Sequence, residues 1–139
     1  MTTFMTTVRA RRRVNSYRDL IVWQRTMDLV VIAYRLTKRF PVEERHALVQ
    51  QVRRSAVSVP SNIAEGHGRN HLGDYLRHLS IARGSLMELE TQLLIAGRMA
   101  YIGRVDGDGI LEKSAEVGRM LSGLIRTLEE KYRGRGARS

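Results

Sequence analysis

Apolar side chains recur along most of this chain in alternating steps of three and four residues. Between Arg18 and Phe40 this step predicts one amphipathic helix, which ends at Phe40 because the residue before a proline avoids the helical region. The apolar stripe of this helix consists of Leu20, Trp23, Met27, Val30 and Tyr34. No run alternates convincingly with the period of two that is typical of strands. The pattern therefore predicts an all-α protein.

Three further segments repeat the same step. We expect Pro41, Glu43 and Glu44 to open the second helix, because a proline and acidic side chains suit a helix N-terminus. The second stripe consists of Val49, Val52, Ala56, Val59 and Ile63. The third consists of Leu72, Tyr75, Leu79, Ala82, Leu86, Leu89, Leu93, Ala96 and Ala100. The fourth consists of Ile110, Ser114, Val117, Leu121, Leu124 and Leu128.

The turn before the fourth helix is predicted at VDGDG, residues 105–109, with Asp106 or Asp108 as its N-cap. A repeat of 3.5 residues on four segments joined by short connections indicates a left-handed, antiparallel, up-down-up-down four-helix bundle. We expect this bundle to occupy residues 17–132, between a basic, disordered leader at 1–16 and a basic, disordered tail at 133–139.

The stretch SVPSNIAEGHGR, residues 58–69, concentrates the residues with chemical potential. Pro60 predicts a kink in the second helix, and Ser58 or Ser61 is placed to satisfy a backbone group that the proline frees. Gly66 and Gly68 are expected to stop the helix in the left-handed conformation. Beyond them, Asn70 is expected to cap the third helix. These roles are all structural.

Catalytic and metal-binding interpretations of the same stretch are weaker. Ser61, Glu65 and His67 supply a nucleophile, an acid and a base, but without a recognisable spacing. The GHG triplet follows a helix rather than a strand, so it lacks the context of a dinucleotide site. A metal site would require three of four side chains to converge on one point: His67, His71, Asp74 and His78. We expect no enzyme, no cofactor and no metal, and Glu65 paired with Arg53, Arg54 or Arg69.

The first helix is too apolar for a single buried face. Twelve of the 17 residues between Leu20 and Leu36 are apolar, and a helix that is apolar nearly all round must be buried on more than one side. Self-association would bury the surplus apolar surface of this helix, and a wide core face within one chain is the alternative explanation. The predicted oligomer interface consists of Ile21, Val22, Leu29, Ile32, Leu36, Leu94 and Ile95.

Positive charge is concentrated at the two ends of the chain. The formal net charge is +10, yet residues 14–130 hold 16 basic and 14 acidic side chains. Blocks of like charge suit binding of a polyanion, although 21 arginines among 24 basic residues also fit a codon bias. The predicted nucleic-acid contacts are Arg9, Arg11, Arg12, Arg13, Arg53, Arg54, Arg69, Lys131, Arg133, Arg135 and Arg138.

Targeting signals are not apparent in the sequence. The chain has no cysteine, no apolar secretory segment at its start, and no apolar run long enough for a membrane span. The longest such run is LVVIAY, from Leu29. We therefore expect a cytoplasmic protein without a membrane partner.

Three stretches carry a resemblance to a known family: YRDLIVWQRTMDLV at 17–30, SVPSNIAEGHGR at 58–69 and YLRHLSIARGSLMELETQL at 75–93. They resemble the bacterial four-helix bundle proteins encoded in intervening sequences of large-subunit ribosomal RNA genes. The resemblance spans about residues 17 to 125. Relatives include the accessory variability determinant protein of diversity-generating retroelements, a basic five-membered ring that binds nucleic acid and a reverse transcriptase.

The resemblance implies partners but no catalytic residues. It implies a homo-oligomer, in particular a pentameric ring, with nucleic acid and a protein such as a reverse transcriptase as partners. Together with the charge pattern it predicts a non-enzymatic protein that binds nucleic acid, RNA in particular, through basic surfaces and tails. The alternative is a protein-interaction scaffold that does not bind nucleic acid directly.

Overall fold

The structure, a computed structural model, describes residues 14–138 and the side chains of residues 14–135. The long helices are α2 (Ile21–Thr37), α3 (Leu48–His67), α4 (Leu72–Arg98) and α5 (Arg104–Arg138). Two short 3-10 helices, η1 (Tyr17–Asp19) and η2 (Val42–Glu44), precede α2 and α3. The described part of the chain contains no strand. The predicted all-α class and the four-helix bundle are confirmed.

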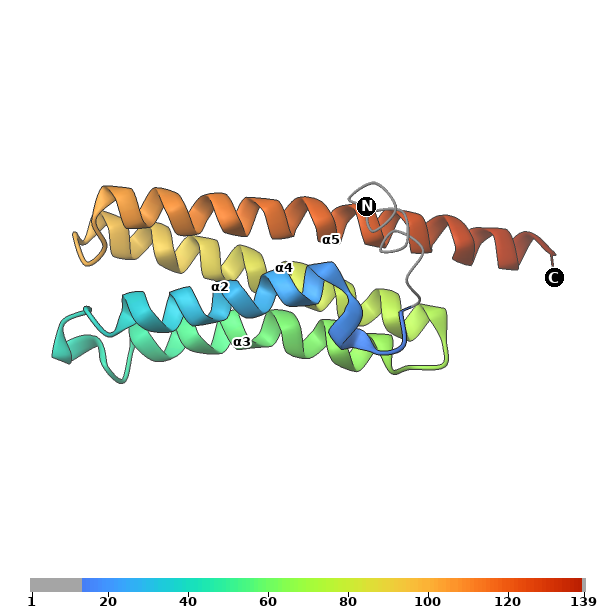
Figure 1. Ribbon diagram of the computed structural model, residues 1–139, viewed down its shortest axis with the longest axis horizontal. Coiled ribbons are helices and arrows are strands. Elements are labelled where there is room, and N and C mark those ends of the chain that lie inside the picture. Colours follow the sequence, from blue (N-terminus) through green and yellow to red (C-terminus); the bar gives the residue numbers. More distant parts are fainter. Residues whose placement is uncertain (1–13, 139) are drawn as a thin grey trace, which may run out of the picture.

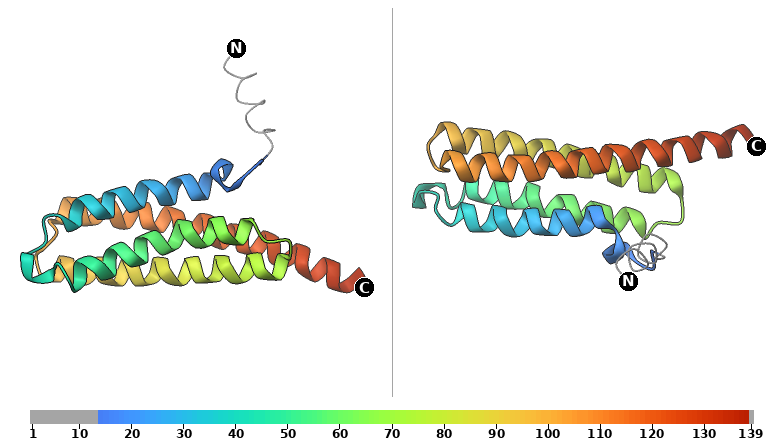
Figure 2. Two further views of the ribbon diagram at one scale, coloured as in Figure 1. Left: turned by 90° about the horizontal axis from the view of Figure 1, so that it is seen from below. Right: turned by 45° about the horizontal axis from the view of Figure 1, so that its top comes forward.

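Successive helices lie side by side and run in opposite directions (Figure 1). Contacts join α2 to α3, α3 to α4, and α4 to α5, and α5 packs back against α2 to close the bundle. The two views of Figure 2 show that the C-terminal end of α5 projects beyond the turn that joins α3 to α4. None of the helices in residues 14–138 combines the length and apolar character that a membrane crossing requires.

The core is formed by the predicted stripes of α3, α4 and α5. All five stripe residues of α3 are buried, as are six on α4, from Leu79 to Ala96. On α5, the buried positions include Ile110, Ser114, Val117 and Leu121. The three-four step therefore located most of the core on these three helices. It was wrong at Ala100, which is exposed beyond the end of α4, and at Leu124, beside which Ile125 is the buried residue.

On α2 the predicted core face is wrong. The buried side chains of α2 are Val22, Thr26, Leu29, Ala33, Leu36 and Thr37. The predicted stripe lies at the edge of the bundle, and Met27 on it is 40% exposed. Two threonines are tolerated in the core because their hydroxyls are hydrogen-bonded. The hydroxyl of Thr26 donates to the Trp23 carbonyl, and that of Thr37 donates to the Tyr34 carbonyl.

The turn before α5 also differs from the prediction. Residues 105–109 are helical, and the chain reverses instead at residues 99–103, where Ala100 adopts a left-handed φ of 61°. Side-chain packing fixes where the chain reverses. Ile102 is buried, and the centres of the Tyr101 and Phe40 rings lie 5.5 Å apart. Asp106, a predicted N-cap, lies inside α5 and accepts a hydrogen bond from Arg39 at 2.8 Å.

The structure gives the stretch 58–69 a different local role from the one predicted. Helix α3 continues through Pro60 to His67, and the predicted kink stays a prediction. Neither Gly66 nor Gly68 has a positive φ, so the predicted left-handed stop is wrong. The N-cap of α4 is His71, without a capping hydrogen bond from its side chain, so the predicted cap at Asn70 is wrong as well.

The predicted boundary of the C-terminal tail is also corrected. Helix α5 extends to Arg138, whereas a disordered tail was predicted from residue 133. Residues 133–138 contain three arginines and an alanine, which favour helix, and two glycines, which disfavour it. Extension of an existing helix adds one hydrogen bond for each residue fixed, which offsets the cost of the glycines. Residues 1–13 of the predicted leader lie outside the described residues.

Gly66 sets the distance between α3 and α4. A Cβ atom at Gly66 would lie 2.7 Å from the His78 Cβ and 3.0 Å from a ring carbon of Tyr75. Both separations are far shorter than ordinary van der Waals contact. The glycine is thus required by close helix packing rather than by a turn.

We predict that Gly66→Ala destabilises the protein by about 1–3 kcal/mol, because overpacking forces α4 away from α3. Gly84→Ala is the matched control, since a Cβ there meets no atom within 4 Å. This control is expected to stabilise helix α4 by about 0.5–1 kcal/mol. Urea unfolding followed by circular dichroism measures both variants. Equal stability of Gly66→Ala and the unmodified protein would contradict the close packing.

Candidate functional site

An apolar groove lies between α2 and α3. It encloses about 350 Å³ and is lined by Tyr17, Trp23, Met27, Val30, Val57, Pro60, Ser61 and Ala64. A second hollow of about 380 Å³ continues it along α2 and is lined by Val30, Val31, Tyr34, Arg35 and Lys38. We call these two hollows together the α2–α3 groove. Among the residues that the structure describes, no acidic side chain lines either hollow.

Aromatic packing shapes the groove at both ends. The rings of Tyr17 and Trp23 meet edge to face at 5.3 Å, and a capping box between Ser16 and Asp19 fixes the 3-10 helix that carries Tyr17. At the other end, the Arg53 guanidinium stacks over the Tyr34 ring at 4.6 Å. These contacts hold large apolar side chains at the rim of the groove rather than in the core.

The structure divides the predicted oligomer interface into core and surface. Val22, Leu29 and Leu36 are buried inside the bundle, so their assignment to an interface is wrong. Ile32 is half-buried, and the exposed members of the set are Ile21, Leu94 and Ile95. The prediction missed the groove residues because α2 is apolar on both sides. Its periodicity alone did not show which side faces the core.

A second exposed apolar surface lies on α4. Its large exposed side chains are Ile81, Met87, Leu94 and Ile95, and Met99 follows directly after the helix. The described residues thus present two apolar surfaces on different helices, the α2–α3 groove and this face of α4. Exposed apolar side chains that gather on one surface mark candidate interaction sites.

The C-terminal end of α5 carries cations on a projecting helix. Lys131, Arg133 and Arg135 are exposed, and none of the three has an ion-pair partner among the described residues. We call residues 131–138 the basic end of α5. The other predicted contacts at the chain ends, Arg9, Arg11, Arg12, Arg13 and the side chain of Arg138, lie outside what the structure describes.

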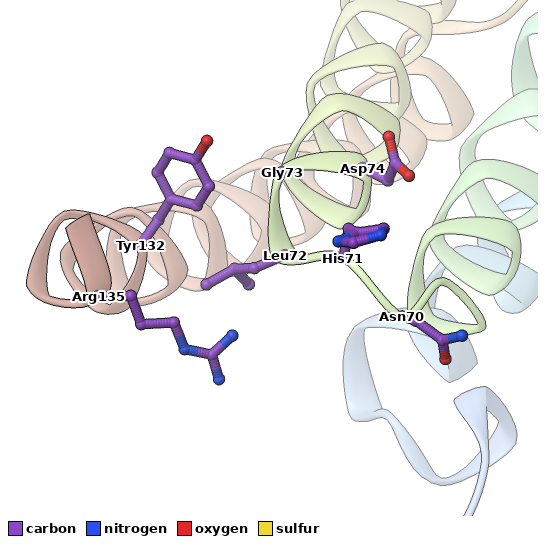
Figure 3. Close-up of a pocket in the computed structure, with 7 residues that line it drawn as sticks. All are labelled: Asn70, His71, Leu72, Gly73, Asp74, Tyr132 and Arg135. Atoms are coloured by element: carbon purple, nitrogen blue, oxygen red, sulfur yellow. The ribbon is translucent and has the colours of Figure 1, made fainter. Parts of the chain in front are cut away.

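The basic end of α5 begins beside the start of α4. Figure 3 shows Tyr132 and Arg135 on α5, next to the first residues of α4. A Cβ at Gly73 would lie 3.5 Å from the Tyr132 ring, so the phenol rests against the α4 backbone. The shallow hollow here, of about 390 Å³, is lined by Asn70, His71, Leu72, Gly73, Asp74, Tyr132 and Arg135.

Three arginines predicted as contacts on the body of the bundle have different surroundings. Arg53 is half-buried, stacks on Tyr34 and donates from Nε to the Thr37 hydroxyl at 3.0 Å. Arg69 donates to Glu65 at 2.9 Å, which is one of the three pairings predicted for that carboxylate. Arg54 is exposed, without an ion-pair partner among residues 14–138. Of these three, Arg54 presents the least engaged cation.

The structure does not bring the three catalytic candidates together. Ser61 lines the α2–α3 groove, whereas Glu65 binds Arg69. The His67 ring packs edge to face on Tyr75 at 5.7 Å, and burial raises the pKa of the Tyr75 phenol. No hydrogen bond links Ser61, Glu65 and His67 within the described residues. Over the same residues, no group of three potential ligands is arranged to hold a metal ion.

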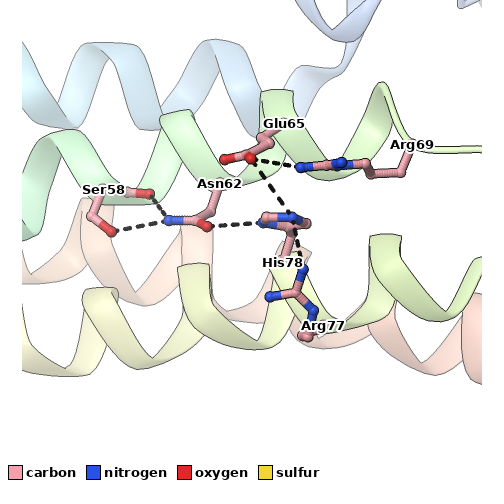
Figure 4. A network of polar contacts seen from close by, with 6 residues as sticks. All are labelled: Ser58, Asn62, Glu65, Arg69, Arg77 and His78. Atoms are coloured by element: carbon pink, nitrogen blue, oxygen red, sulfur yellow. Dashed lines mark hydrogen bonds and ion pairs between the residues drawn. The ribbon is translucent and has the colours of Figure 1, made fainter.

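The polar side chains of residues 58–69 instead reach α4 (Figure 4). The hydroxyls of Ser58 and Ser85 lie 2.7 Å apart, and the Asn62 amide nitrogen donates to Ser58. His78 joins this network through Asn62 at 3.1 Å, and its side chain is only 6% exposed. The sequence signal for this network is the position of His78 and Ser85, seven residues apart beside the apolar stripe of α4.

Comparisons with known proteins agree with this architecture. The crystal structure of a protein of unknown function from the S23 ribosomal protein family of Bacteroides thetaiotaomicron matches with a TM-score of 0.70 and 28% sequence identity. The match covers 76% of this chain and 98% of that one. A comparison with curated proteins gives no match. The model of the 23S rRNA-intervening sequence protein family matches residues 18–123. These residues include most of the bundle, and the chain therefore belongs to the 23S rRNA-intervening sequence protein family.

Proposed function

We propose that this chain is a non-enzymatic, cytoplasmic, homo-oligomeric protein that binds nucleic acid, RNA in particular, through the basic end of α5. The observation that carries the proposal is the projecting helix end itself. Its three exposed cations, Lys131, Arg133 and Arg135, have no acidic partner among the described residues. Arginine forks suit bidentate phosphate contacts. The family description, which refers to the intervening sequence of 23S rRNA, favours RNA as the ligand.

Self-association supports this function because every subunit adds its own basic end of α5 to the assembly. The α2–α3 groove and the exposed face of α4 are unlike surfaces on different helices. Contact between unlike surfaces of identical chains is heterologous, and it closes into a ring when the rotation allows. The resemblance to ring-forming relatives makes five the expected subunit number. A ring gathers several basic ends of α5 on one assembly, where each contributes phosphate contacts.

The expected binding is directed to the backbone of the nucleic acid. Phosphate contacts position a protein without reading sequence, and each neutralised phosphate releases counterions. Apart from Tyr132, the aromatic rings described above lie in helix packing or in the groove. Stacking of several successive bases is therefore not expected, and salt is expected to weaken binding steeply.

A protein-interaction scaffold is the second candidate function. It is favoured by the α2–α3 groove, whose Trp23, Met27 and Val30 side chains form an apolar surface at the rim. In that case the groove holds a different protein, such as a reverse transcriptase, and the cations have no role in it. Removal of the charges at the end of α5 distinguishes the two functions, because only nucleic-acid binding depends on those charges.

We predict that replacing Lys131, Arg133 and Arg135 together by glutamine weakens binding to a structured RNA and to a DNA duplex. The slope of log affinity against log salt should decrease by roughly two to three, because up to three phosphate contacts are lost per chain. Fluorescence anisotropy at low and near-physiological salt measures both quantities. The matched control replaces Arg104, Lys113 and Arg119, which are exposed on the other half of α5. Equal loss in both triple variants would contradict a site at the end of α5.

We predict that Val31→Glu, in the α2–α3 groove, shifts the protein to a smaller assembly, because burial of a carboxylate in an apolar contact opposes association. Val105→Glu is the control, since Val105 is 86% exposed and Val31 45%. Sedimentation velocity gives the solution mass, and its ratio to the 15.9 kDa chain mass gives the subunit number. A monomeric unmodified protein, or an unchanged assembly in Val31→Glu, would contradict self-association through the groove.

A further inference from the structure

A buried histidine between α3 and α4 faces two groups of opposite charge. The side chain of His78 is 6% exposed, and its ring nitrogens point to different partners (Figure 4). Nδ1 lies 3.1 Å from Oδ1 of Asn62. Nε2 lies 3.4 Å from a guanidinium nitrogen of Arg77 and 4.0 Å from a carboxylate oxygen of Glu65. The proposed binding function does not use this cluster.

The hydrogen bonds around Asn62 determine which imidazole nitrogen carries the proton. One amide atom of Asn62 lies 2.9 Å from the Ser58 backbone carbonyl, which only accepts hydrogen bonds, so that atom is the nitrogen. The amide oxygen therefore faces His78 and accepts from Nδ1. Neutral His78 is thus protonated at Nδ1, and its Nε2 holds a lone pair.

The partner of Nε2 then depends on the protonation state of His78. In the neutral ring the lone pair accepts a hydrogen bond from Arg77, because the guanidinium has donors only. In the protonated ring Nε2 becomes a donor, which suits the Glu65 carboxylate and repels the Arg77 guanidinium. The Nδ1 bond to Asn62 is the same in both states, so the ring stays anchored.

We propose that His78 is a proton-operated switch: when neutral it binds Arg77, and when protonated it binds Glu65 and releases Arg77 to solvent. Arg77 is already exposed, so its release requires no change in the backbone. Glu65 also accepts from Arg69 at 2.9 Å, and a carboxylate has acceptor sites for both partners. Acidification therefore changes the charge presented at this end of the bundle while the α3–α4 interface keeps its polar contacts.

The charged surroundings of His78 belong to α3 and α4. Glu65 faces it from α3, and Arg77 faces it from its own helix. Arg69, in the loop that follows α3, pairs with Glu65. The neighbouring titratable rings, His67 and Tyr75, pack on each other. No charged side chain of α2 or α5 forms a hydrogen bond or ion pair with this cluster in the part of the chain that the structure describes.

Nitrogen NMR of the full-length protein tests the switch directly. At alkaline pH, the two-bond correlations of His78 are expected to show a proton on Nδ1 alone. At acid pH both nitrogens are expected to carry a proton, and the Arg77 side chain is expected to gain the fast motion of a free guanidinium. His71 is the internal control, because its side chain forms no hydrogen bond within the described residues. A proton on Nε2 in the neutral ring, or Arg77 motion that does not change with pH, would overturn the proposal.

Two variants give an independent test of the same switch. Melting temperatures are compared between about pH 5 and pH 8, the range in which an imidazole ordinarily changes its charge. Arg77→Gln removes the partner of the neutral ring, so its deficit relative to the unmodified protein should be larger at alkaline pH. Glu65→Gln removes the partner of the protonated ring, so its deficit should be larger at acid pH.

The control for these variants is Arg39→Gln, which breaks the exposed Arg39–Asp106 ion pair and involves no partner of His78. Its deficit should be the same across the range. Opposite pH dependences for Arg77→Gln and Glu65→Gln support the exchange of partners. Parallel curves for those two variants would overturn it, because both groups would then act on a single protonation state.

Discussion

The close approach of α3 and α4 is the constraint on which the other features depend. Gly66 leaves space for the His78 Cβ, which a methyl group at residue 66 would meet at 2.7 Å. At that separation, Asn62 and Ser58 on one helix reach His78 and Ser85 on the other. Buried polar groups are costly unless each finds a partner. The distance between these two helices therefore decides whether a histidine is tolerated inside the bundle.

Helix α2 explains why the bundle has an apolar surface left over. It carries apolar side chains on two sides, and α3 and α5 bury only the side that contains Leu29 and Ala33. The other side, with Trp23 and Val30, forms the wall of the α2–α3 groove. In a four-helix bundle each helix packs against two neighbouring helices. For α2 these neighbours are α3 and α5, which cover its inward side and leave its outward side exposed. The surplus is thus a direct consequence of the α2 composition.

Charge is distributed in a complementary way. Acidic and basic side chains nearly balance between residues 14 and 130. Two ion pairs join distant parts of the described chain, Arg25 with Glu116 and Arg39 with Asp106. The basic end of α5 projects beyond the turn between α3 and α4 (Figure 2), and its three exposed cations form no ion pair within the described residues. Apolar surface on the body and cations on a projecting helix therefore occupy separate places. This separation allows association and phosphate binding to occur together.

The sequence by itself determined the all-α class, four helices and the core faces of α3, α4 and α5, because one apolar stripe per helix permits only one buried side. It also indicated that Glu65 pairs with an arginine, since Arg69 is one helical turn away. Tertiary structure alone decided which side of α2 is buried, because both sides are equally apolar. It also decided the turn at residues 99–103 and the role of Gly66. Those features depend on contacts with Phe40 and His78, which are distant in the chain and leave no local pattern.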